Sequence, residues 1–316
     1  MTELLVVSNV TQRMAGRLAE AFDVTYLADI EAEAWLKDSA DAVRYLLTDG
    51  PTGVPDDLLA RLPKVEVISN LGVGYDGVNT DVATARGIPV THTPGVLNEE
   101  VATTAVMLYL ACWRNFEAEM AQARSGRWAT EGNLPLPPTA DGRRIGILGL
   151  GRIGKAIAAK LAPWASEICY FGRNRQDVDY RYFADLRQMA AHCDCVINIA
   201  PGGDGTHHLV DRAVMDAIGP DGRLINVGRG STVDEAALID ALSEGTLGGA
   251  GLDVFENEPY IPETLRQMSN VGLLPHVASA SIETRQAMGD LAVDNLIAWK
   301  EGRPLLSPVP ESAELL

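Results

Sequence analysis

A glycine-rich motif in the middle of the chain constrains the fold more than any other sequence feature. Residues 149–154 read GLGRIG, with an apolar, strand-like stretch at 144–148 before them and a helix-like stretch at 155–161 after them. In this context Gly149 permits a sharp turn, Gly151 lets a pyrophosphate approach the main chain, and Gly154 lets the helix pack on its strand. The motif predicts a dinucleotide-binding unit, with a ligand-free glycine turn as the alternative. The predicted cofactor contacts here are Gly149, Gly151, Arg152, Ile153 and Gly154.

The residues after the second strand of this unit predict which dinucleotide binds. Residues 168–171 form an apolar strand, and the chain continues with Gly172, Arg173, Asn174 and Arg175. An NAD-type site would carry Asp or Glu at the strand end to accept hydrogen bonds from the ribose hydroxyls. Here no carboxylate would repel a 2′-phosphate, and two guanidinium groups could bind one. We therefore predict that Arg173, Asn174 and Arg175 bind NADP(H) in preference to NAD(H), with a solvated basic turn as the alternative.

Length and composition indicate a globular protein of two domains. The chain has 316 residues, and 47% of them are hydrophobic, which is normal for full cores. A formal net charge of −17 argues against nucleic acid and anionic membranes as partners. The first residues lack the pattern of a signal peptide, and no apolar run is long enough to span a bilayer. We therefore expect a cytoplasmic enzyme.

The cysteines and the paired histidines predict no metal site. One residue separates Cys193 from Cys195, whereas the common zinc and redox motifs have two intervening residues. We expect all four cysteines to be small hydrophobic side chains in the core. His207 and His208 have no ligand partners nearby in sequence and indicate a loop.

Alternating segments predict two α/β units with parallel sheets. Near the N-terminus, strands are expected at residues 4–8, 45–48, 65–69 and 89–92, and helices at 13–22 and 57–61. A long helix is predicted from Glu99 to about Arg124, with Asn98 as its N-cap. Later strands are expected at 196–199, 223–227, 250–254 and 271–274, and helices at 233–242 and 281–300.

Five blocks of the sequence resemble the D-isomer-specific 2-hydroxyacid dehydrogenase family, and the resemblance covers essentially the whole chain. The blocks are, in order, residues 72–76 (GVGYD), 149–154 (GLGRIG), 226–230 (NVGRG), 252–259 (LDVFENEP) and 274–276 (LPH). Residues 134–136 and 172–175 look most like the NADPH-preferring glyoxylate/hydroxypyruvate reductases and their hydroxyphenylpyruvate-reducing relatives. The resemblance also implies a homodimer built mainly on the cofactor domain, with the helix from Glu99 in the interface.

The predicted architecture is therefore α/β, with two doubly wound parallel-sheet domains. A Rossmann cofactor domain, residues 99–281, is inserted in a flavodoxin-like catalytic domain, residues 1–98 and 282–316. The implied reaction is the NADPH-dependent reduction of a small 2-oxo acid to the D-2-hydroxy acid.

The resemblance assigns catalytic roles to Arg229, Glu258 and His276, and the chemistry asks for the same three parts. Hydride addition to a ketone builds negative charge on its oxygen, which needs a donor to stabilise it and an acid to protonate it. Arg229 can bridge the ketone oxygen and the carboxylate, and His276 can give the proton. If Glu258 lies within hydrogen-bond reach of His276, it can orient the imidazole ring and favour its charged form.

Other positions carry over from the family as binding residues. The N–H groups of Val73 and Gly74 match its carboxylate-binding loop, a small anion nest. Arg229 and His276 contact substrate as well, and Asp253 matches a position at the nicotinamide end of the cofactor.

Two alternative functions stay open at the level of sequence. One keeps the enzyme class and changes the substrate to 2-ketogluconate, an aryl-pyruvate, a branched 2-oxo acid or phosphite. The other is a dinucleotide-sensing, corepressor-like binding protein, which an intact set of Arg229, Glu258 and His276 disfavours. Singly, each of these three residues could instead be structural.

Overall fold

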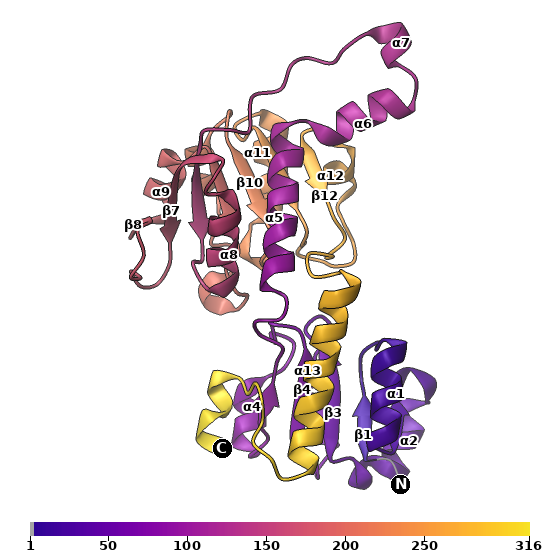
Figure 1. Ribbon diagram of the computed structural model, residues 1–316. Helices are drawn as coiled ribbons and strands as arrows, with labels where there is room; N and C mark the ends of the chain where they lie inside the picture. Colours follow the sequence, from indigo (N-terminus) through magenta and orange to yellow (C-terminus); the bar gives the residue numbers. More distant parts are fainter. Residues whose placement is uncertain (1–2) are drawn as a thin grey trace. The chain divides into compact units, whose positions relative to one another are not determined.

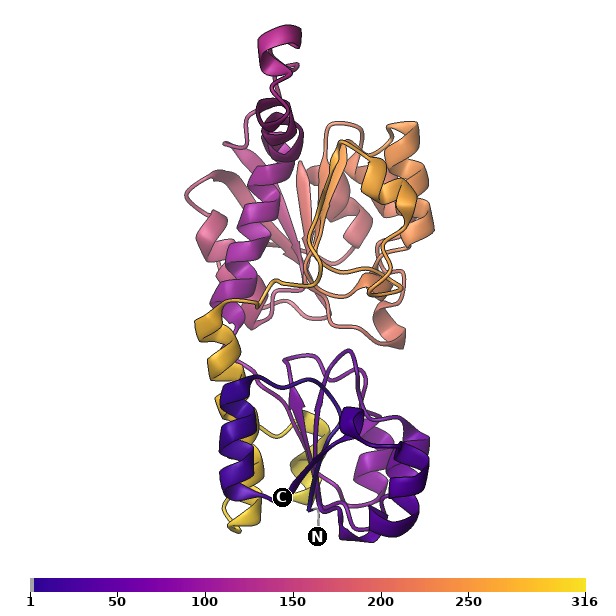
Figure 2. The same ribbon diagram turned by 90° about the vertical axis from the view of Figure 1, so that its right-hand side faces the viewer.

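The computed structural model describes residues 3–316, which fall into two compact units. The first is built from both ends of the chain, up to Leu97 and again over Ala280–Leu316, and the second is Asn98–Ser279. Each unit contains one parallel β-sheet with helices packed on it (Figures 1 and 2). The predicted fold class, two parallel-sheet α/β domains with one inserted in the other, is therefore confirmed.

The first unit has a five-stranded sheet in the order β2-β1-β3-β4-β5, the flavodoxin-like order. Its strands are β1 (Leu4–Val6), β2 (Val24–Tyr26), β3 (Tyr45–Asp49), β4 (Val67–Leu71) and β5 (Val90–Thr91). Its helices are α1 (Gln12–Ala21), α2 (Ala32–Ser39), α3 (Asp56–Ala60), α4 (Thr80–Ala85) and α13 (Ile282–Lys300). Strand β2 was missed by the sequence reasoning because its short segment has no clear apolar pattern.

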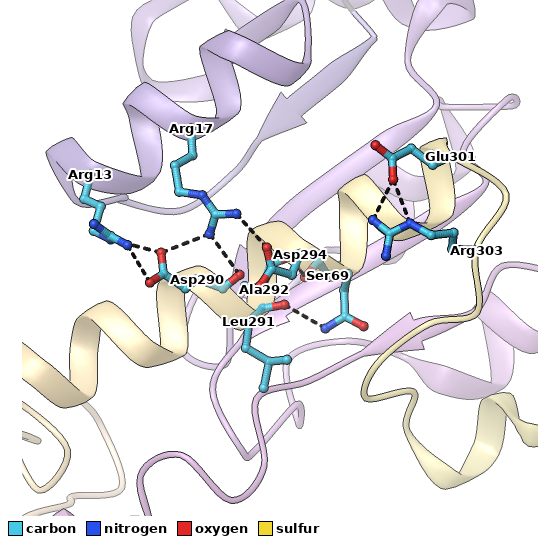
Figure 3. A network of polar contacts seen from close by, with 10 residues as sticks. Arg13, Arg17, Ser69, Asp290, Leu291, Ala292, Asp294, Glu301 and Arg303 are labelled. Atoms are coloured by element: carbon cyan, nitrogen blue, oxygen red, sulfur yellow. Dashed lines mark hydrogen bonds and ion pairs between the residues drawn. The ribbon is translucent and has the colours of Figure 1, made fainter.

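Helix α13 joins the C-terminal part of the chain to this first sheet. It packs on β4 and α1, and Ser69 Oγ donates a 2.9 Å hydrogen bond to the Ala292 carbonyl. Arg13 and Arg17 on α1 form ion pairs with Asp290 at 2.9 and 3.0 Å (Figure 3). After α13 the chain returns to β5, where the Val309 N–H donates to the Val90 carbonyl. The C-terminal segment is therefore part of the N-terminal unit.

The second unit has a seven-stranded sheet in the order β12-β11-β10-β9-β6-β7-β8. Numbered from β6, this is the 3-2-1-4-5-6 order of a Rossmann fold with one additional parallel strand. The strands are β6 (Arg143–Leu148), β7 (Ala165–Phe171), β8 (Arg181–Phe183), β9 (Cys195–Asn198), β10 (Arg223–Asn226), β11 (Gly249–Leu252) and β12 (Val271–Leu273). The helices are α5 (Asn98–Trp113), α6 (Phe116–Arg124), α7 (Trp128–Glu131), α8 (Arg152–Leu161), α9 (Leu186–His192), α10 (Arg212–Ile218), α11 (Glu235–Glu244) and α12 (Glu263–Gln267).

The long helix expected from Glu99 to Arg124 is wrong in two respects. It is interrupted at Asn115, whose left-handed backbone (φ 51°) ends the run of helical hydrogen bonds between α5 and α6. Asn98 is also not an N-cap, because it lies within the first turn of α5 and its buried Oδ1 has no hydrogen-bond partner among residues 3–316. Apolar periodicity continued through the break, so it could not reveal a single left-handed residue.

Three of the four cysteines are buried, and Cys112 is partly buried. Among residues 3–316 no group of three or more acidic, histidine or cysteine side chains could hold a metal ion. In that same part of the chain, no helix combines the length and apolar character needed to cross a membrane.

Candidate active site

The glycine motif has the geometry needed at a phosphate-binding turn. Gly149 follows β6 with a φ of +100°, a conformation that glycine adopts without strain. A Cβ on Gly154 would lie 2.2 Å from the Gly149 carbonyl oxygen, so only glycine lets α8 approach the turn. Gly151 precedes α8 without a side-chain cap, and a Cβ there would meet no atom within 4 Å. The helix N-terminus is therefore open to a phosphate group.

The basic loop after β7 is fixed beside this turn. Gln176 Nε2 donates a 2.6 Å hydrogen bond to the carbonyl of Leu150, inside the glycine motif, and the Gln176 N–H donates to the Tyr170 hydroxyl at 2.7 Å. The exposed side chains of Arg173 and Arg175 have no carboxylate partner among residues 3–316. Sequence reasoning missed Gln176, because only the folded loop shows that it ties the arginines to the glycine turn.

Arg229 follows β10 and is positioned by a buried network of polar side chains. Its carbonyl accepts hydrogen bonds from Asn226 Nδ2 at 3.0 Å and from Thr232 Oγ1 at 2.6 Å. Asn198 Nδ2 in turn donates to Asn226 Oδ1 and Thr232 Oγ1, at 3.1 and 2.6 Å. These three side chains are at most 1% exposed. The network fixes the main chain from which the Arg229 side chain extends.

Sequence reasoning missed this network, because Asn198, Asn226 and Thr232 come from separate segments. Two strand ends, β9 and β10, bring the amides together. The signal that was available is weak: a polar amide closing each of two apolar strands, at the sheet edge where ligands bind in such folds.

Glu258 and His276 form a direct pair. His276 Nδ1 and Glu258 Oε2 are 2.6 Å apart, and the Phe255 N–H donates to Glu258 Oε1 at 3.0 Å. Burial raises the pKa of Glu258, but the hydrogen bonds from His276 and Phe255 and the positive charges of His276 and Arg229 outweigh it, so the pKa lies below its ordinary value. The carboxylate is therefore held ionised against the ring.

The imidazole of His276 keeps one ring nitrogen for a ligand. Its Nδ1 is used by Glu258, and Nε2 has no hydrogen-bond partner among residues 3–316. The side chain is 34% exposed, so solvent and small molecules reach it. His276 has a left-handed backbone (φ 52°), an uncommon conformation for a residue other than glycine, which is often found where function requires it.

Asp253, at the end of β11, holds the segment that carries His276. The side chain is fully buried, and its two carboxylate oxygens accept hydrogen bonds from the N–H groups of Val277 and Ala278, at 2.8 and 2.9 Å. Its own carbonyl accepts from the His276 N–H at 2.8 Å. Burial raises the pKa of Asp253 above its ordinary value, against the effect of these bonds. These contacts stabilise the unusual backbone at His276.

In the first unit, the loop after β4 presents main-chain groups rather than side chains. The carbonyl of Val73 accepts from His92 Nδ1 at 2.9 Å, and the carbonyl of Gly74 accepts from Asn70 Nδ2 at 2.9 Å. The N–H groups of Val73 and Gly74 have no acceptor in the described part of the chain. With carbonyls fixed and N–H groups unused, the loop has the donors of an anion nest.

These features define a class of protein: a nucleotide-dependent dehydrogenase with a Rossmann sheet and an Arg, Glu and His set at the carboxyl ends of consecutive strands. The family model for the NAD binding domain of D-isomer specific 2-hydroxyacid dehydrogenases matches residues 106–278. The chain belongs to the D-isomer specific 2-hydroxyacid dehydrogenase family.

Relatives with assigned activities resemble the chain over nearly its whole length. It is 40% identical to glyoxylate/hydroxypyruvate reductase A HPR2 of Arabidopsis thaliana, over 97% of this chain and 98% of that protein. It is 39% identical to 2-ketogluconate reductase of Gluconobacter oxydans, with the same two coverages. Among solved structures, the NADPH-dependent glyoxylate/hydroxypyruvate reductase SmGhrB of Sinorhizobium meliloti, in complex with NADP and malonate, is 46% identical with a TM-score of 0.92, covering 98% and 97% of the two chains.

Proposed function

We propose that this enzyme reduces a small 2-oxo acid to the D-2-hydroxy acid with NADPH. The overall change consumes one 2-oxo acid, one NADPH and one proton and yields the hydroxy acid and NADP⁺. The observation that carries the proposal is the 2.6 Å pair of Glu258 and His276, with the charge of Arg229 acting on the same carboxylate. This arrangement supplies an acid, its orienting base and a cation for the developing charge.

His276 is the proposed proton donor. With Nδ1 bonded to Glu258, Nε2 is the ring nitrogen left to protonate the carbonyl oxygen as it gains negative charge. The ionised Glu258 stabilises the positively charged ring before the transfer and fixes its orientation. Asp253 supports the same step indirectly, because it holds the main chain on both sides of the histidine.

Arg229 is the proposed substrate anchor. A planar guanidinium can donate to the carboxylate of a 2-oxo acid and to the neighbouring carbonyl oxygen at once. The second interaction strengthens as charge builds on that oxygen, so Arg229 contributes to binding and to the chemical step. We assign the N–H groups of Val73 and Gly74 to the substrate carboxylate, since they are unused donors in an otherwise fixed loop.

The residues around the glycine turn fit NADPH, which supplies the hydride when bound. The open N-terminus of α8, with Gly149, Gly151, Arg152, Ile153 and Gly154, suits the pyrophosphate. The guanidinium groups of Arg173 and Arg175, which have no carboxylate partner in the described part of the chain, suit the adenosine 2′-phosphate, with Asn174 between them. The NADP complex of the Sinorhizobium relative supports the same choice of cofactor.

The proposed substrate is glyoxylate or hydroxypyruvate. Relatives named for these acids and for 2-ketogluconate have nearly equal identity to the chain, so a panel of acids is the appropriate test. Oxidation of NADPH would be followed at 340 nm with glyoxylate, hydroxypyruvate, 2-ketogluconate, hydroxyphenylpyruvate and, in reverse with NADP⁺, phosphite. We expect the highest kcat/KM with glyoxylate or hydroxypyruvate. Tight NADPH binding without turnover of any acid would favour the corepressor-like alternative.

We also propose that the enzyme is a homodimer. Large apolar side chains are exposed along α6, α7 and the following loop, namely Phe116, Trp128 and Leu136, which are 56, 64 and 94% exposed. Figures 1 and 2 show α6 and α7 projecting from the body of their own unit. Such side chains on a projecting arm are typical of a surface that a second copy covers. Light scattering at micromolar concentration should give twice the chain mass of 33.8 kDa, and a monomer would refute the proposal.

A further inference from the structure

A pocket lies at the opposite edge of the seven-stranded sheet from the residues described above. Its volume is about 190 Å³, and Arg223, Asn115, Asn270 and three prolines (Pro135, Pro137 and Pro138) contribute to its lining. Arg223 is the first residue of β10, so the pocket opens at the amino ends of the strands. Arg229 and His276 follow the carboxyl ends of their strands. None of the proposed catalytic or cofactor-binding residues lines this pocket.

Two guanidinium groups meet at one aromatic ring beside the pocket. The Cζ atoms of Arg143 and Arg223 lie 4.0 and 4.9 Å from the centre of the Trp113 ring. Neither arginine has a carboxylate within ion-pair distance among residues 3–316. Burial lowers the pKa of Arg223, and the neighbouring charge of Arg143 adds to this effect. The charges of Asp221 and Asp194 act on Arg223 and Arg143 from a distance, but within residues 3–316 neither arginine forms a direct ion pair.

The donors of this cluster outnumber its acceptors. Arg223 uses Nη1 alone, donating to the carbonyls of Asp221 and Gly222 at 3.3 and 2.9 Å. Its Nε and Nη2 groups have no acceptor in the described part of the chain. The indole Nε1 of Trp113 is buried and likewise has no partner there. Because Arg223 lines the pocket and two of its nitrogens have no acceptor among residues 3–316, the geometry suits an acidic ligand with acceptor oxygens.

The guanidinium is confined rather than free to turn to solvent. A Cβ on Gly248 would lie 2.2 Å from Arg223 Nη1 and 2.3 Å from the Pro220 carbonyl oxygen. A Cβ on Gly249 would lie 3.1 Å from Arg223 Cδ. The side chain thus occupies space that two adjacent glycines leave open. A cation held in one place loses little conformational entropy when it binds an anion.

We propose that this pocket binds a small organic acid, with its carboxylate on Arg223 and its flat apolar body against the three prolines. The volume is several times that of one water molecule, about 30 Å³, so a body larger than a water can enter. The proline rings provide apolar contact, and the unused donors of Arg223 provide the fork that a carboxylate fits. The long-range negative field of the chain favours a small monoanion over a polyanion.

Benzoate is the probe, and its uncharged isostere benzamide tests the role of charge. Calorimetric titrations would compare the wild type with Arg223→Gln and with Arg181→Gln. Arg181 is a matched control because its guanidinium also stacks on an aromatic ring, Phe183, at 4.6 Å in the same unit. We expect Arg223→Gln to weaken benzoate about 10- to 150-fold, the range for one charged hydrogen bond, and Arg181→Gln to have no effect. Benzamide should bind far more weakly than benzoate to the wild type.

Several outcomes would overturn the proposal. Unchanged benzoate affinity in Arg223→Gln would mean that the acid binds elsewhere, for example at Arg229. Equal affinity for benzamide and benzoate would mean that the charge of the ligand does not contribute to binding. Tighter binding of inorganic phosphate than of benzoate would mean that the apolar part of the ligand does not contribute. Arg223→Lys guards against misfolding of the Gln variant, since it keeps the charge and should retain part of the affinity. Turnover of the 2-oxo acid should be unaffected in all three variants, so the two proposals can fail independently.

Discussion

In the unit of residues 98–279, the loops after β10, β11 and β12 carry ionisable side chains, Arg229, Glu258 and His276. In the other unit, the loop after β4 presents the N–H groups of Val73 and Gly74, with its carbonyls fixed by Asn70 and His92. Under the proposed function, the carboxyl edge of a parallel sheet therefore supplies side-chain chemistry in one unit and main-chain binding in the other. A side-chain site depends on residue identity, whereas a main-chain site changes only when the backbone moves.

The largest effect is expected at the side-chain site. His276→Ala should lower kcat by about 10²- to 10⁴-fold, the usual value of general acid catalysis, and leave the Kd for NADPH nearly unchanged. His192→Ala is a matched control, because His192 also pairs with a glutamate, Glu167, at 2.7 Å in the same unit. Steady-state kinetics and NADPH titration of both variants measure the effect. Near-normal turnover of His276→Ala would show that His276 is not the proton donor. The claim that this unit contributes side-chain chemistry would then lose its main support.

The sequence predicted the residues at both edges through the family resemblance. The strand alternation and the glycine motif predicted both parallel sheets, because each signal is local. Five short motifs, found in order along the chain, carry the family resemblance, and that resemblance identified Arg229, Glu258 and His276. The pairing of Glu258 with His276 was predicted only as a condition, and the structure meets it.

What the sequence could not predict depends on contacts between distant segments. The buried amides of Asn198 and Asn226 meet only when β9 and β10 pair, and Gln176 reaches Leu150 only when its loop folds back. The break at Asn115 is a single left-handed residue inside an apolar pattern that continues on both sides. Each of these features is set by tertiary structure, which periodicity does not contain.

A second prediction tests side-chain binding of the cofactor. Arg173→Ala should raise the Kd for NADPH by about 10- to 150-fold, since a charged hydrogen bond contributes about 1.5–3 kcal/mol. The Kd for NADH should barely change, because NADH lacks the 2′-phosphate. Arg187→Ala is the control, an exposed arginine of the same unit that is paired with Asp211 at 3.0 Å. Equal losses for both cofactors would show that Arg173 is structural.

A third prediction tests main-chain binding in the other unit. A Cβ on Gly50 would lie 2.8 Å from the Gly74 carbonyl oxygen, so in Gly50→Ala the loop of Gly50 or the loop of Val73 and Gly74 must shift, and the contact that places Gly74 is lost. We expect the KM for the 2-oxo acid to rise about tenfold, equivalent to one weakened hydrogen bond of about 1.4 kcal/mol, with the Kd for NADPH unchanged.

The matched control for this variant is another glycine of the same unit. Gly16 lies in α1, and a Cβ there would meet nothing within 4 Å. Gly16→Ala should leave KM unchanged and stabilise the protein by about 0.5–1 kcal/mol, because alanine is the better helix former. An unaltered KM in Gly50→Ala would contradict the proposal that the N–H groups of Val73 and Gly74 bind the substrate.

The smallest effect is expected where ion pairs support the first unit without reaching its sheet edge. Hydrogen bonds and charges from Arg13 and Arg17 lower the pKa of Asp290 below its ordinary value, against the effect of burial. A lowered carboxyl pKa means that the pairing stabilises the fold above the unfolded pKa of about 3.9 and that this stability is lost as pH falls through the folded pKa. Asp290→Asn should therefore lower the free energy of unfolding at pH 7 by at most about 1 kcal/mol, since the paired side chains, drawn in Figure 3, are 30 to 55% exposed.

Urea unfolding of Asp290→Asn and the wild type between pH 7 and pH 3, at low and high salt, measures this difference. The gap between the two proteins should narrow toward acid pH and in high salt, because the variant no longer has the charge that is being protonated or screened. Turnover and KM at pH 7 should match the wild type. A loss of turnover with intact stability would instead mean that a shift of α13 moves the binding loops. The expectation that these ion pairs affect stability alone would then be wrong.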